Sequence, residues 1–357
     1  MGIREERQLE LANKWMDSGK RGVIFACPRF GKIRTAIIIL NKLEYKRVLV
    51  AYPDRKIRAS WENEFEEMKY DSSTITYTTH ISLKKHVKEQ WDLVIADECH
   101  LLSNAQIETC KEIRPNTPIL GLSGTLSSWS EKVLKMELNL PVVGIYSIEQ
   151  AIAEGVITDY QITIVRVALD NTVKQRYKNV FLTEKAMFER YGWIIDKLTN
   201  QGRDAMFPRL GRMRIIQHSL AKQKKTIQLL EQFKDSRVLV FCGLTEIADN
   251  LGIPSYHSKS SEKAIFEDFL SGNGNHMAVV KIGNTGLTYS PLHKVIINYF
   301  DSNAQNLAQK LMRATSLEFD NPDKKADIWI CCTTEETEKK WLLHALEFFE
   351  KSKIKWI

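Results

Sequence analysis

Residues 94–100 read VIADECH, a short apolar run that ends in two adjacent carboxylates, Asp97 and Glu98, and a histidine. Residues 22–32 read GVIFACPRFGK, a second apolar run that leads into a glycine and Lys32. A glycine-lysine turn after one buried strand and an acidic pair after another are typical of a site for a nucleoside triphosphate and its magnesium ion. In such a site the lysine meets the phosphates, backbone N–H groups surround them, and the acids hold the metal and a water.

Apolar runs alternate with stretches of helical periodicity on both sides of these motifs. The runs are apolar throughout, as expected of strands that are covered on both faces of a parallel sheet. In the first half, the predicted strands are 22–27, 47–52, 75–79, 92–96 and 118–122, and the predicted helices are 32–44, 56–69, 80–90 and 104–113. In the second half, the predicted strands are 161–169, 237–242, 277–281, 294–299 and 327–332, and the predicted helices are 225–234, 262–271, 303–317 and 335–350.

This alternation predicts an α/β fold with two tandem domains, each a parallel sheet with helices on both faces. We place the first domain at residues 1–150 and the second at 151–357, with a hinge within 145–160. Residues 172–225 interrupt the second domain and are predicted to form a helical insertion.

The insertion is strongly basic. The chain has a net charge of +7, whereas residues 172–225 contain thirteen Lys or Arg and four Asp or Glu, a balance of +9. Such a block is typical either of a solvated helical face or of a surface that binds a polyanion such as nucleic acid. Its aromatic residues are predicted to pack the insertion internally: Tyr177, Phe181, Phe188, Tyr191 and Trp193.

Hydrophobicity, the N-terminal residues and the cysteines indicate where in the cell the protein is expected. No apolar run approaches the roughly 18 residues of a membrane span, and the charged N-terminus lacks the apolar centre of a secretion signal. The six cysteines contain no C-x-x-C pair, which favours buried thiols in a reducing compartment over disulfides or zinc. We therefore expect a cytoplasmic protein with no membrane partner.

Taken in chain order, the motifs resemble those of superfamily 2 DExH-type helicases and translocases, particularly phage-type and Swi/Snf-like DNA translocases. Residues 97–100 have the form of the DExH element, and residues 26–32 resemble the P-loop. Residues 123–125 (SGT) resemble the motif that couples nucleotide state to strand binding, and residues 309–313 (QKLMR) resemble the element that carries an arginine finger. The resemblance implies two RecA-like domains that use ATP and Mg²⁺ and act on DNA, single-stranded or branched, in the cytosol of a bacterium or a phage-infected host.

The resemblance also implies roles for individual residues, to which the basic insertion adds three arginines. The expected catalytic residues are Lys32, Asp97, Glu98, Gln309 and Arg313, with Asp97 as the metal ligand. The expected nucleotide-binding residues are Arg4, Gln8, Pro28, Arg29, Phe30, Gly31, Lys32, Ile33 and Gly286. The expected nucleic-acid contacts are Pro53, Arg55, Trp61, Thr79, Thr125, Arg209, Arg212, Arg214, His257, Thr285 and Thr288.

Four positions depart from the family pattern, and one of them is Phe30 in the P-loop, where a small residue is usual. Ile33 follows the P-loop lysine, where the family has a Thr or Ser whose hydroxyl binds magnesium. Thr35 projects roughly 200° around the helix axis from position 33 and cannot replace that hydroxyl. In the arginine-finger element, Met312 replaces a glycine and Ser316 replaces the second arginine, which leaves Arg313 as the finger candidate.

These departures leave more than one function open. The first reading is an ATP-dependent DNA helicase or translocase of replication, recombination or repair, with a slow ATPase, acting as a monomer and meeting replication or recombination proteins. The alternatives are a relative that binds nucleic acid but has lost hydrolysis, and an RNA-dependent ATPase or helicase.

Overall fold

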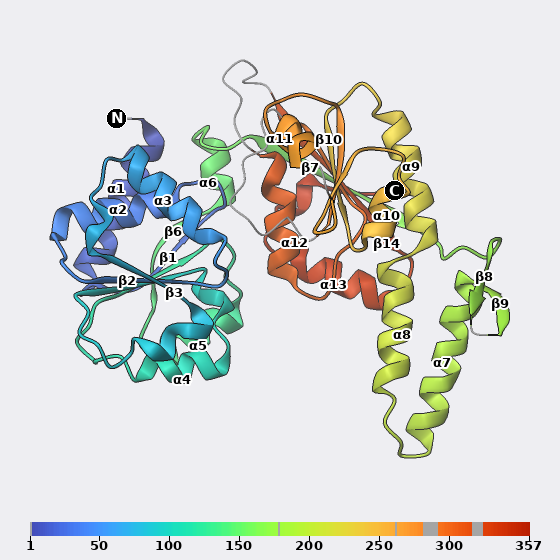
Figure 1. Ribbon diagram of the computed structural model, residues 1–357, viewed down its shortest axis with the longest axis horizontal. Helices are drawn as coiled ribbons and strands as arrows, with labels where there is room; N and C mark the ends of the chain where they lie inside the picture. Colours follow the sequence, from blue (N-terminus) through green and yellow to red (C-terminus); the bar gives the residue numbers. More distant parts are fainter. Residues whose placement is uncertain (1, 178, 261–262, 281–291, 316–323) are drawn as a thin grey trace. The chain divides into compact units, whose positions relative to one another are not determined.

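The computed structural model describes residues 2–177, 179–260, 263–280, 292–315 and 324–357. The chain forms two compact units, Met1–Ile157 and Thr158–Ile357, which are described separately below (Figure 1). The division falls inside the segment 145–160 in which a hinge was predicted. None of the described helices combines the length and the apolar composition that crossing a bilayer requires.

The first unit alternates strands and helices along its whole length. Its elements are α1 (Ile3–Asp17), β1 (Arg21–Ala26), α2 (Lys32–Leu43), β2 (Val48–Tyr52), α3 (Ile57–Glu67), η1 (Ser72–Thr74), β3 (Ile75–Thr79), η2 (His80–Lys85), β4 (Leu93–Asp97), η3 (Cys99–Leu101), α4 (Asn104–Lys111), β5 (Ile119–Ser123), α5 (Ser128–Leu138), β6 (Val142–Tyr146) and α6 (Ile148–Ala153).

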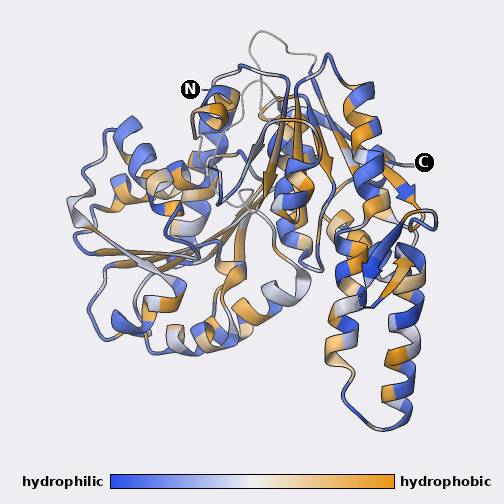
Figure 2. Cartoon of the chain, turned by 45° about the vertical axis from the view of Figure 1, so that its right-hand side comes forward, coloured by the Kyte–Doolittle hydropathy of each residue, from blue (hydrophilic) through white to orange (hydrophobic). Residues whose placement is uncertain are grey.

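The strands of this unit form one parallel sheet in the order β3-β2-β4-β5-β1-β6. Helices α1, α2 and α3 cover one face, and α4 and α5 cover the other (Figure 1). Strands β2, β4 and β5 are buried at every residue, so both of their faces are apolar (Figure 2). The predicted parallel sheet with helices on both faces is therefore confirmed in this unit.

The sequence predictions for this unit missed α1, α5, β6 and α6 and differ from the structure over residues 80–90. The predicted helix 80–90 is a short 3₁₀ segment, His80–Lys85, which begins where the Thr79 hydroxyl accepts the Ser82 N–H at 3.3 Å. Helix α1 was not predicted, because only a few of its residues are buried and its apolar stripe is correspondingly narrow.

The second unit contains a second sheet and an insertion. Its described elements are β7 (Asp159–Val167), β8 (Lys174–Tyr177), β9 (Val180–Thr183), α7 (Glu184–Asn200), α8 (Met206–Gln217), α9 (Leu220–Gln232), β10 (Val238–Cys242), α10 (Thr245–Asp249), β11 (Ser255–Tyr256), α11 (Lys263–Leu270), β12 (His276–Val280), β13 (Lys294–Ile297), α12 (Ala304–Leu311), η4 (Met312–Ala314), β14 (Lys325–Thr333), α13 (Glu336–Leu346), η5 (Lys351–Lys353) and β15 (Ile354–Trp356).

The described strands of the second sheet follow the order β11-β12-β10-β13-β14-β7-β15, and neighbouring strands are parallel. Two parallel α/β sheets in tandem are the arrangement of RecA-like domains, so the predicted fold class is confirmed. Strand β15 at the sheet edge was not predicted, because a three-residue strand leaves almost no pattern in the sequence.

The insertion begins with an antiparallel β8–β9 hairpin that was not predicted. Helices α7 and α8 follow and run side by side as a long hairpin away from the second sheet (Figure 1). The base of this hairpin packs through Leu169, Phe188 and Ile216, with Trp341 of α13 against them. The prediction that all the aromatic residues pack internally was wrong for Phe181 and Trp193, which are 66% and 63% exposed.

A buried ion pair joins α9 to α13 in the second unit. The Lys222 Nζ lies 2.6 Å from Glu338 Oε1, and both side chains are fully buried. The other oxygen, Glu338 Oε2, accepts the backbone N–H of Thr333 at 2.6 Å. The Lys222 ammonium also lies 5.4 Å from the centre of the Phe300 ring. Within the described residues, each charge is therefore compensated mainly by its partner and a few fixed dipoles.

Removing one member of this pair is expected to cost more than removing both. Lys222→Met leaves the Glu338 charge buried and should lower the free energy of unfolding by about 3–5 kcal/mol. Lys222→Met combined with Glu338→Leu should recover most of that loss. Lys339→Met breaks the exposed Lys339–Glu336 pair on the same helix and should cost less than about 1 kcal/mol. Denaturant unfolding measures all three, and equal losses for Lys222→Met and Lys339→Met would contradict the expectation.

Candidate nucleotide-binding site

Five loops meet at one edge of the first sheet. Because the strands are parallel, the residues that follow β1, β2, β3, β4 and β5 all lie at the carboxyl edge. Ligands of open α/β sheets bind at this edge. The topology therefore brings together the P-loop after β1, the acidic pair after β4 and residues 123–125 after β5.

The P-loop forms a tight turn that opens directly into α2. Arg29 and Gly31 have positive φ angles of 71° and 92°, and α2 begins at Lys32. Left-handed residues alternating with ordinary ones turn successive backbone N–H groups toward one concave side, which suits an anion. A Cβ added at Gly31 would lie 2.6 Å from Gln8 Nε2, so the position is closed to larger residues by space as well as by φ.

Lys32 and Glu98 form an ion pair across the site. The Lys32 Nζ donates to Glu98 Oε1 at 2.9 Å, and the two side chains are 14% and 18% exposed. Burial by itself lowers the pKa of Lys32, but Glu98 and Asp97 together raise it above its ordinary value. Burial likewise raises the pKa of Glu98, yet its polar neighbours, of which Lys32 has the largest effect, together lower that pKa below its ordinary value and keep the carboxyl ionised. Both groups are therefore charged at neutral pH.

Gly124 lies beneath this pair. A Cβ added at Gly124 would fall 2.7 Å from Lys32 Nζ, so any larger residue would push the ammonium aside. The backbone N–H of Gly124 also helps to lower the pKa of Glu98. The glycine of the 123–125 motif thus leaves room for the lysine and favours the ionised carboxylate.

Asp97 is held by a tryptophan. The Trp61 indole Nε1 donates to Asp97 Oδ2 at 2.9 Å, and both side chains are buried. Asp97 Oδ1 accepts the backbone N–H of Glu98 at 3.0 Å. Burial, with the adjacent Glu98 charge, raises the pKa of Asp97 to about 6. A second positive charge near Asp97 would therefore be favourable.

A buried polar network links the acidic pair to residues 123–125. His100 Nδ1 lies 2.8 Å from Ser123 Oγ and 3.5 Å from Glu98 Oε2. On the other side of the ring, His100 Nε2 lies 3.4 Å from Thr125 Oγ1. Burial lowers the pKa of His100 to about 4, so the imidazole is neutral and offers one donor and one acceptor. His100, Ser123 and Gly124 were not among the predicted site residues, although both of their motifs had been recognised.

The residues present fit a magnesium ion. In the part of the chain that the structure describes, no group of three or more His, Cys, Asp or Glu side chains could enclose a metal. Magnesium commonly takes one or two carboxylates, keeps several waters and shares oxygens with phosphates. Asp97 and Glu98 supply the carboxylates, and the deficit of positive charge near Asp97 favours a divalent cation.

The other predicted nucleotide-binding residues of the first unit lie around the turn. Gln8 is buried, and its amide Nε2 donates to the Phe30 carbonyl at 2.8 Å. The Phe30 ring is also buried, and its centre lies 4.5 Å from the centre of the Tyr146 ring. Only the backbone of Phe30 is therefore placed to contact a ligand in the turn. Arg4 donates to the Val156 carbonyl at 2.7 Å. Gln8 and Arg4 thus support the turn and the end of the unit, and their contact with a nucleotide stays a prediction.

The predicted nucleic-acid contacts of this unit fall into two sets. Pro53 and Arg55 follow β2, and Thr79 ends β3, so these three lie at the carboxyl edge of the sheet. Arg55 is exposed, and Pro53 and Thr79 are half-buried. Trp61 and Thr125, by contrast, are almost fully buried and bonded to Asp97 and His100. In this structure both side chains therefore lie within the candidate nucleotide site, and their contact with a strand stays a prediction.

The remaining predicted residues belong to the second unit. Gln309 lies on α12 and Arg313 on η4, and their contribution to the site stays a prediction. His257 is buried, with Nε2 3.0 Å from Asp249 Oδ1, so it supports a loop. Gly286, Thr285, Thr288 and Ser316 lie outside the described residues.

The three arginines of α8 do not form one patch. Arg209 and Arg214 are exposed and lie roughly 140° apart around the helix. Arg212 turns inward, and its guanidinium lies 4.1 Å from the centre of the Phe188 ring. Arg212 therefore packs the base of the hairpin, and only Arg209 and Arg214 keep their charge at the surface.

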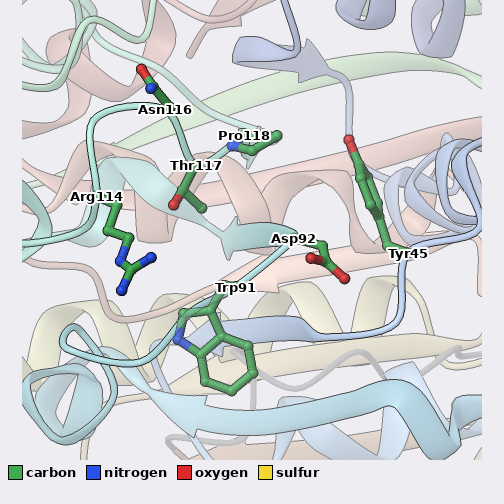
Figure 3. Close-up of a pocket in the computed structure, with 7 residues that line it drawn as sticks. All are labelled: Tyr45, Trp91, Asp92, Arg114, Asn116, Thr117 and Pro118. Carbon is green, nitrogen blue, oxygen red and sulfur yellow. The ribbon is translucent and has the colours of Figure 1, made fainter.

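A shallow pocket of about 350 Å³ lies at the opposite edge of the first sheet (Figure 3). All of its lining residues come from the segments that precede β2, β4 and β5: Tyr45, Trp91, Asp92, Arg114, Asn116, Thr117 and Pro118. Asp92 Oδ2 already accepts the backbone N–H groups of Lys46 and Arg47, each at 3.0 Å. This pocket is separate from the candidate nucleotide site.

Comparison with known proteins finds DNA translocases and helicases among the proteins that this chain resembles. No protein-family model matches the sequence. Among curated proteins, the chain is 22% identical over 268 residues to the DNA 3'-5' translocase XPB2 of Sulfurisphaera tokodaii. The match covers 68% of this chain and 60% of that protein, so the chain spans less than two thirds of the relative's length.

Solved structures share the fold over nearly the whole chain. The Hef helicase domain of Pyrococcus furiosus aligns with a TM-score of 0.52 and 12% identity, over 96% of this chain and 99% of that one. A fragment of an HsdR subunit of a type I restriction enzyme from Vibrio vulnificus YJ016 gives 0.61 and 16%, over 98% and 67%. The DNA-bound type ISP restriction-modification enzyme LlaBIII gives 0.61 and 13%, over 100% and 31%.

The class of protein follows from the fold and the site together: two tandem RecA-like domains with a P-loop and an acidic pair at the carboxyl edge of the first. Within that class, the relatives confirm the resemblance to superfamily 2 helicases and translocases.

The raised pKa of Asp97 predicts a pH-dependent stability. The folded chain keeps a proton on Asp97 up to about pH 6, whereas the unfolded chain loses it near pH 4. The stability of wild type should therefore fall as pH rises through this window. The stability of Asp97→Asn should not show this fall, because an amide does not titrate. We expect the stability of Asp97→Asn relative to wild type to rise by up to about 3 kcal/mol between pH 4 and pH 6.5.

Denaturant unfolding at several pH values, without nucleotide or metal, measures this difference. Asp17→Asn, a change at an exposed carboxylate at the end of α1, is the matched control. If the difference in stability between Asp97→Asn and wild type stayed constant across this pH window, burial would not raise the pKa of Asp97.

Proposed function

We propose that this chain is an ATP-dependent DNA helicase or translocase motor. The observation that carries the proposal is the Lys32–Glu98 pair at 2.9 Å, set at the opening of α2 with Asp97 beside it. A cation, two carboxylates and a ring of backbone N–H groups are the parts needed to bind a triphosphate and attack its γ-phosphate. The DNA part of the proposal rests on what the relatives are named for and on the basic insertion.

In this proposal each side chain has one task. Lys32 leaves Glu98 and meets the β- and γ-phosphates as they enter the turn. Glu98, freed from the lysine, orients the attacking water and takes up its proton. Asp97 would hold magnesium, which neutralises charge on the phosphates. Arg313 of the second unit is proposed to stabilise the charge that develops on the γ-phosphate, with Gln309 near it.

Binding of the strand is proposed to involve the carboxyl edge of the first unit and the surface of the α7–α8 hairpin. Arg55 and Thr79 suit phosphate contacts at that edge, and Arg209 and Arg214 keep exposed charges on the hairpin. Such contacts make binding salt-sensitive and largely independent of sequence.

Turnover of ATP with and without single-stranded DNA tests the catalytic part. Lys32→Ala is expected to lower stimulated turnover at least about 100-fold, because transition-state charge loses its cation. Lys42→Ala removes an exposed lysine from the last turn of the same helix and should leave turnover within about twofold of wild type.

The same assay separates the alternatives. Wild type that binds DNA but shows no turnover would overturn the motor and favour a relative that has lost hydrolysis, which the Ile33 departure would explain. Stronger stimulation by single-stranded RNA than by DNA would favour an RNA-dependent ATPase.

Salt dependence tests the role of the hairpin. Arg209→Ala combined with Arg214→Ala should weaken binding of single-stranded DNA and flatten the slope of log affinity against log salt by about 1.4, or roughly 0.7 for each lost phosphate contact. Lys42→Ala with Lys46→Ala removes two exposed charges from the first unit and should leave the slope unchanged. Fluorescence anisotropy between 50 and 200 mM salt, roughly the range over which such slopes appear, measures both. An unchanged slope in the arginine variant would mean that α8 does not contact the phosphates of the DNA.

A further inference from the structure

We propose that Trp61 is a positioning residue for the metal ligand Asp97 and compensates for the hydroxyl that is missing at position 33. The inference rests on the proposed function, because it concerns the binding of magnesium with a nucleotide. It assigns Trp61 to the metal site of the first unit rather than to contact with nucleic acid.

The contact itself is direct. Trp61 is fully buried, and its Nε1–H donates to Asp97 Oδ2 at 2.9 Å. Asp97 Oδ1 takes the backbone N–H of Glu98 at 3.0 Å, so one donor fixes each carboxylate oxygen. An indole N–H can donate and cannot accept or bind a metal, so it fixes Asp97 without competing for the ion. Each oxygen keeps a further lone pair for a magnesium ion or its waters.

The tryptophan is itself held in place. Its ring lies 5.8 Å from that of Phe65 on the same helix, centre to centre. Helix α3 is tied to α2 by Arg34, whose Nε lies 2.6 Å from Glu64 Oε2 and which also pairs with Glu67. Arg34 comes two residues after Lys32. The helix that carries Trp61 is therefore fastened to the helix that opens at the P-loop.

No hydroxyl group of α2 is placed to bind magnesium. Magnesium in P-loop proteins is held by the Ser or Thr after the lysine and by the aspartate of the acidic motif, which here ends β4. Here Ile33 occupies the first position. Thr35 is buried, and its hydroxyl points at the Gly31 carbonyl 3.4 Å away, within its own helix. With one of the two usual ligands gone, the orientation of Asp97 becomes more important, and Trp61 sets it.

The test compares two buried tryptophans. Trp61→Phe removes the N–H and keeps an aromatic ring. Trp15→Phe is the matched control, because Trp15 is also fully buried and its Nε1 donates to the Ile119 carbonyl at 3.2 Å, at the amino end of β5. Isothermal titration with ATP, with and without Mg²⁺, is the readout, since it reports metal binding separately from turnover.

We expect Trp61→Phe to weaken Mg²⁺-dependent binding of ATP by about tenfold, a typical effect of removing a group that orients a metal ligand. Binding of ATP in EDTA should stay within about twofold of wild type, as should both affinities of Trp15→Phe. Trp61→His keeps a ring N–H in a smaller ring and should bind Mg²⁺ with ATP more tightly than Trp61→Phe does.

Compensation for the hydroxyl predicts a coupling between positions 61 and 33. Ile33→Thr should change Mg²⁺ affinity little in wild type, within about twofold, but should restore most of the tenfold loss in Trp61→Phe. Should Trp61→Phe fail to fold, Trp61→His with and without Ile33→Thr supports the same comparison.

The outcomes separate the inference from the proposed function. Wild type that binds ATP with Mg²⁺, together with a Trp61→Phe variant of equal affinity, would overturn the inference and leave the motor intact. A loss in Trp61→His equal to that in Trp61→Phe would also overturn it, because lost volume and not the lost N–H would be the cause. Wild type that binds no ATP under any condition would instead overturn the proposed function.

Discussion

The parallel pairing of the first sheet is the constraint on which the site depends. Strand order β4-β5-β1 places β5 between the strand that leads to Glu98 and the strand that leads to Lys32. The ion pair between these residues must therefore pass over the end of β5. This path explains why the residue there is Gly124, since a side chain at that point would occupy the path of the lysine. An antiparallel arrangement would have sent these loops to opposite edges.

The candidate nucleotide site also carries more negative than positive charge. Two carboxylates, Asp97 and Glu98, share a single nearby ammonium, and the adjacent His100 is neutral. The first unit thus carries an excess of negative charge at the place where a triphosphate would enter. A nucleotide that arrives without a divalent cation meets repulsion from Asp97, whereas one that brings magnesium supplies the charge that is missing.

The sequence was most informative where a motif is local. The P-loop, the acidic pair and residues 123–125 each lie within a few residues, and buried parallel strands are apolar throughout. The fold class could therefore be predicted, and so could the meeting of Lys32, Asp97 and Glu98 at one edge of the first sheet. The hydrogen bond from Trp61 to Asp97 joins residues that are 36 positions apart and depends on how α3 packs. It could therefore not be predicted from a local sequence pattern. The β8–β9 hairpin was missed because its strands are four residues long and largely exposed, which leaves little apolar signal.

The contact between α1 and the P-loop has a consequence for how this sequence can vary. Gln8 fills the space beside Gly31, and its amide bonds the Phe30 carbonyl. A side chain at position 31 would displace the Gln8 amide and release the turn, and the φ of 92° would strain it whatever residue stood at position 8. The dependence therefore runs in one direction: glycine is required at position 31 whatever the residue at position 8, whereas the Gln8 amide keeps its place only beside a glycine, although 23 positions separate the two in the chain.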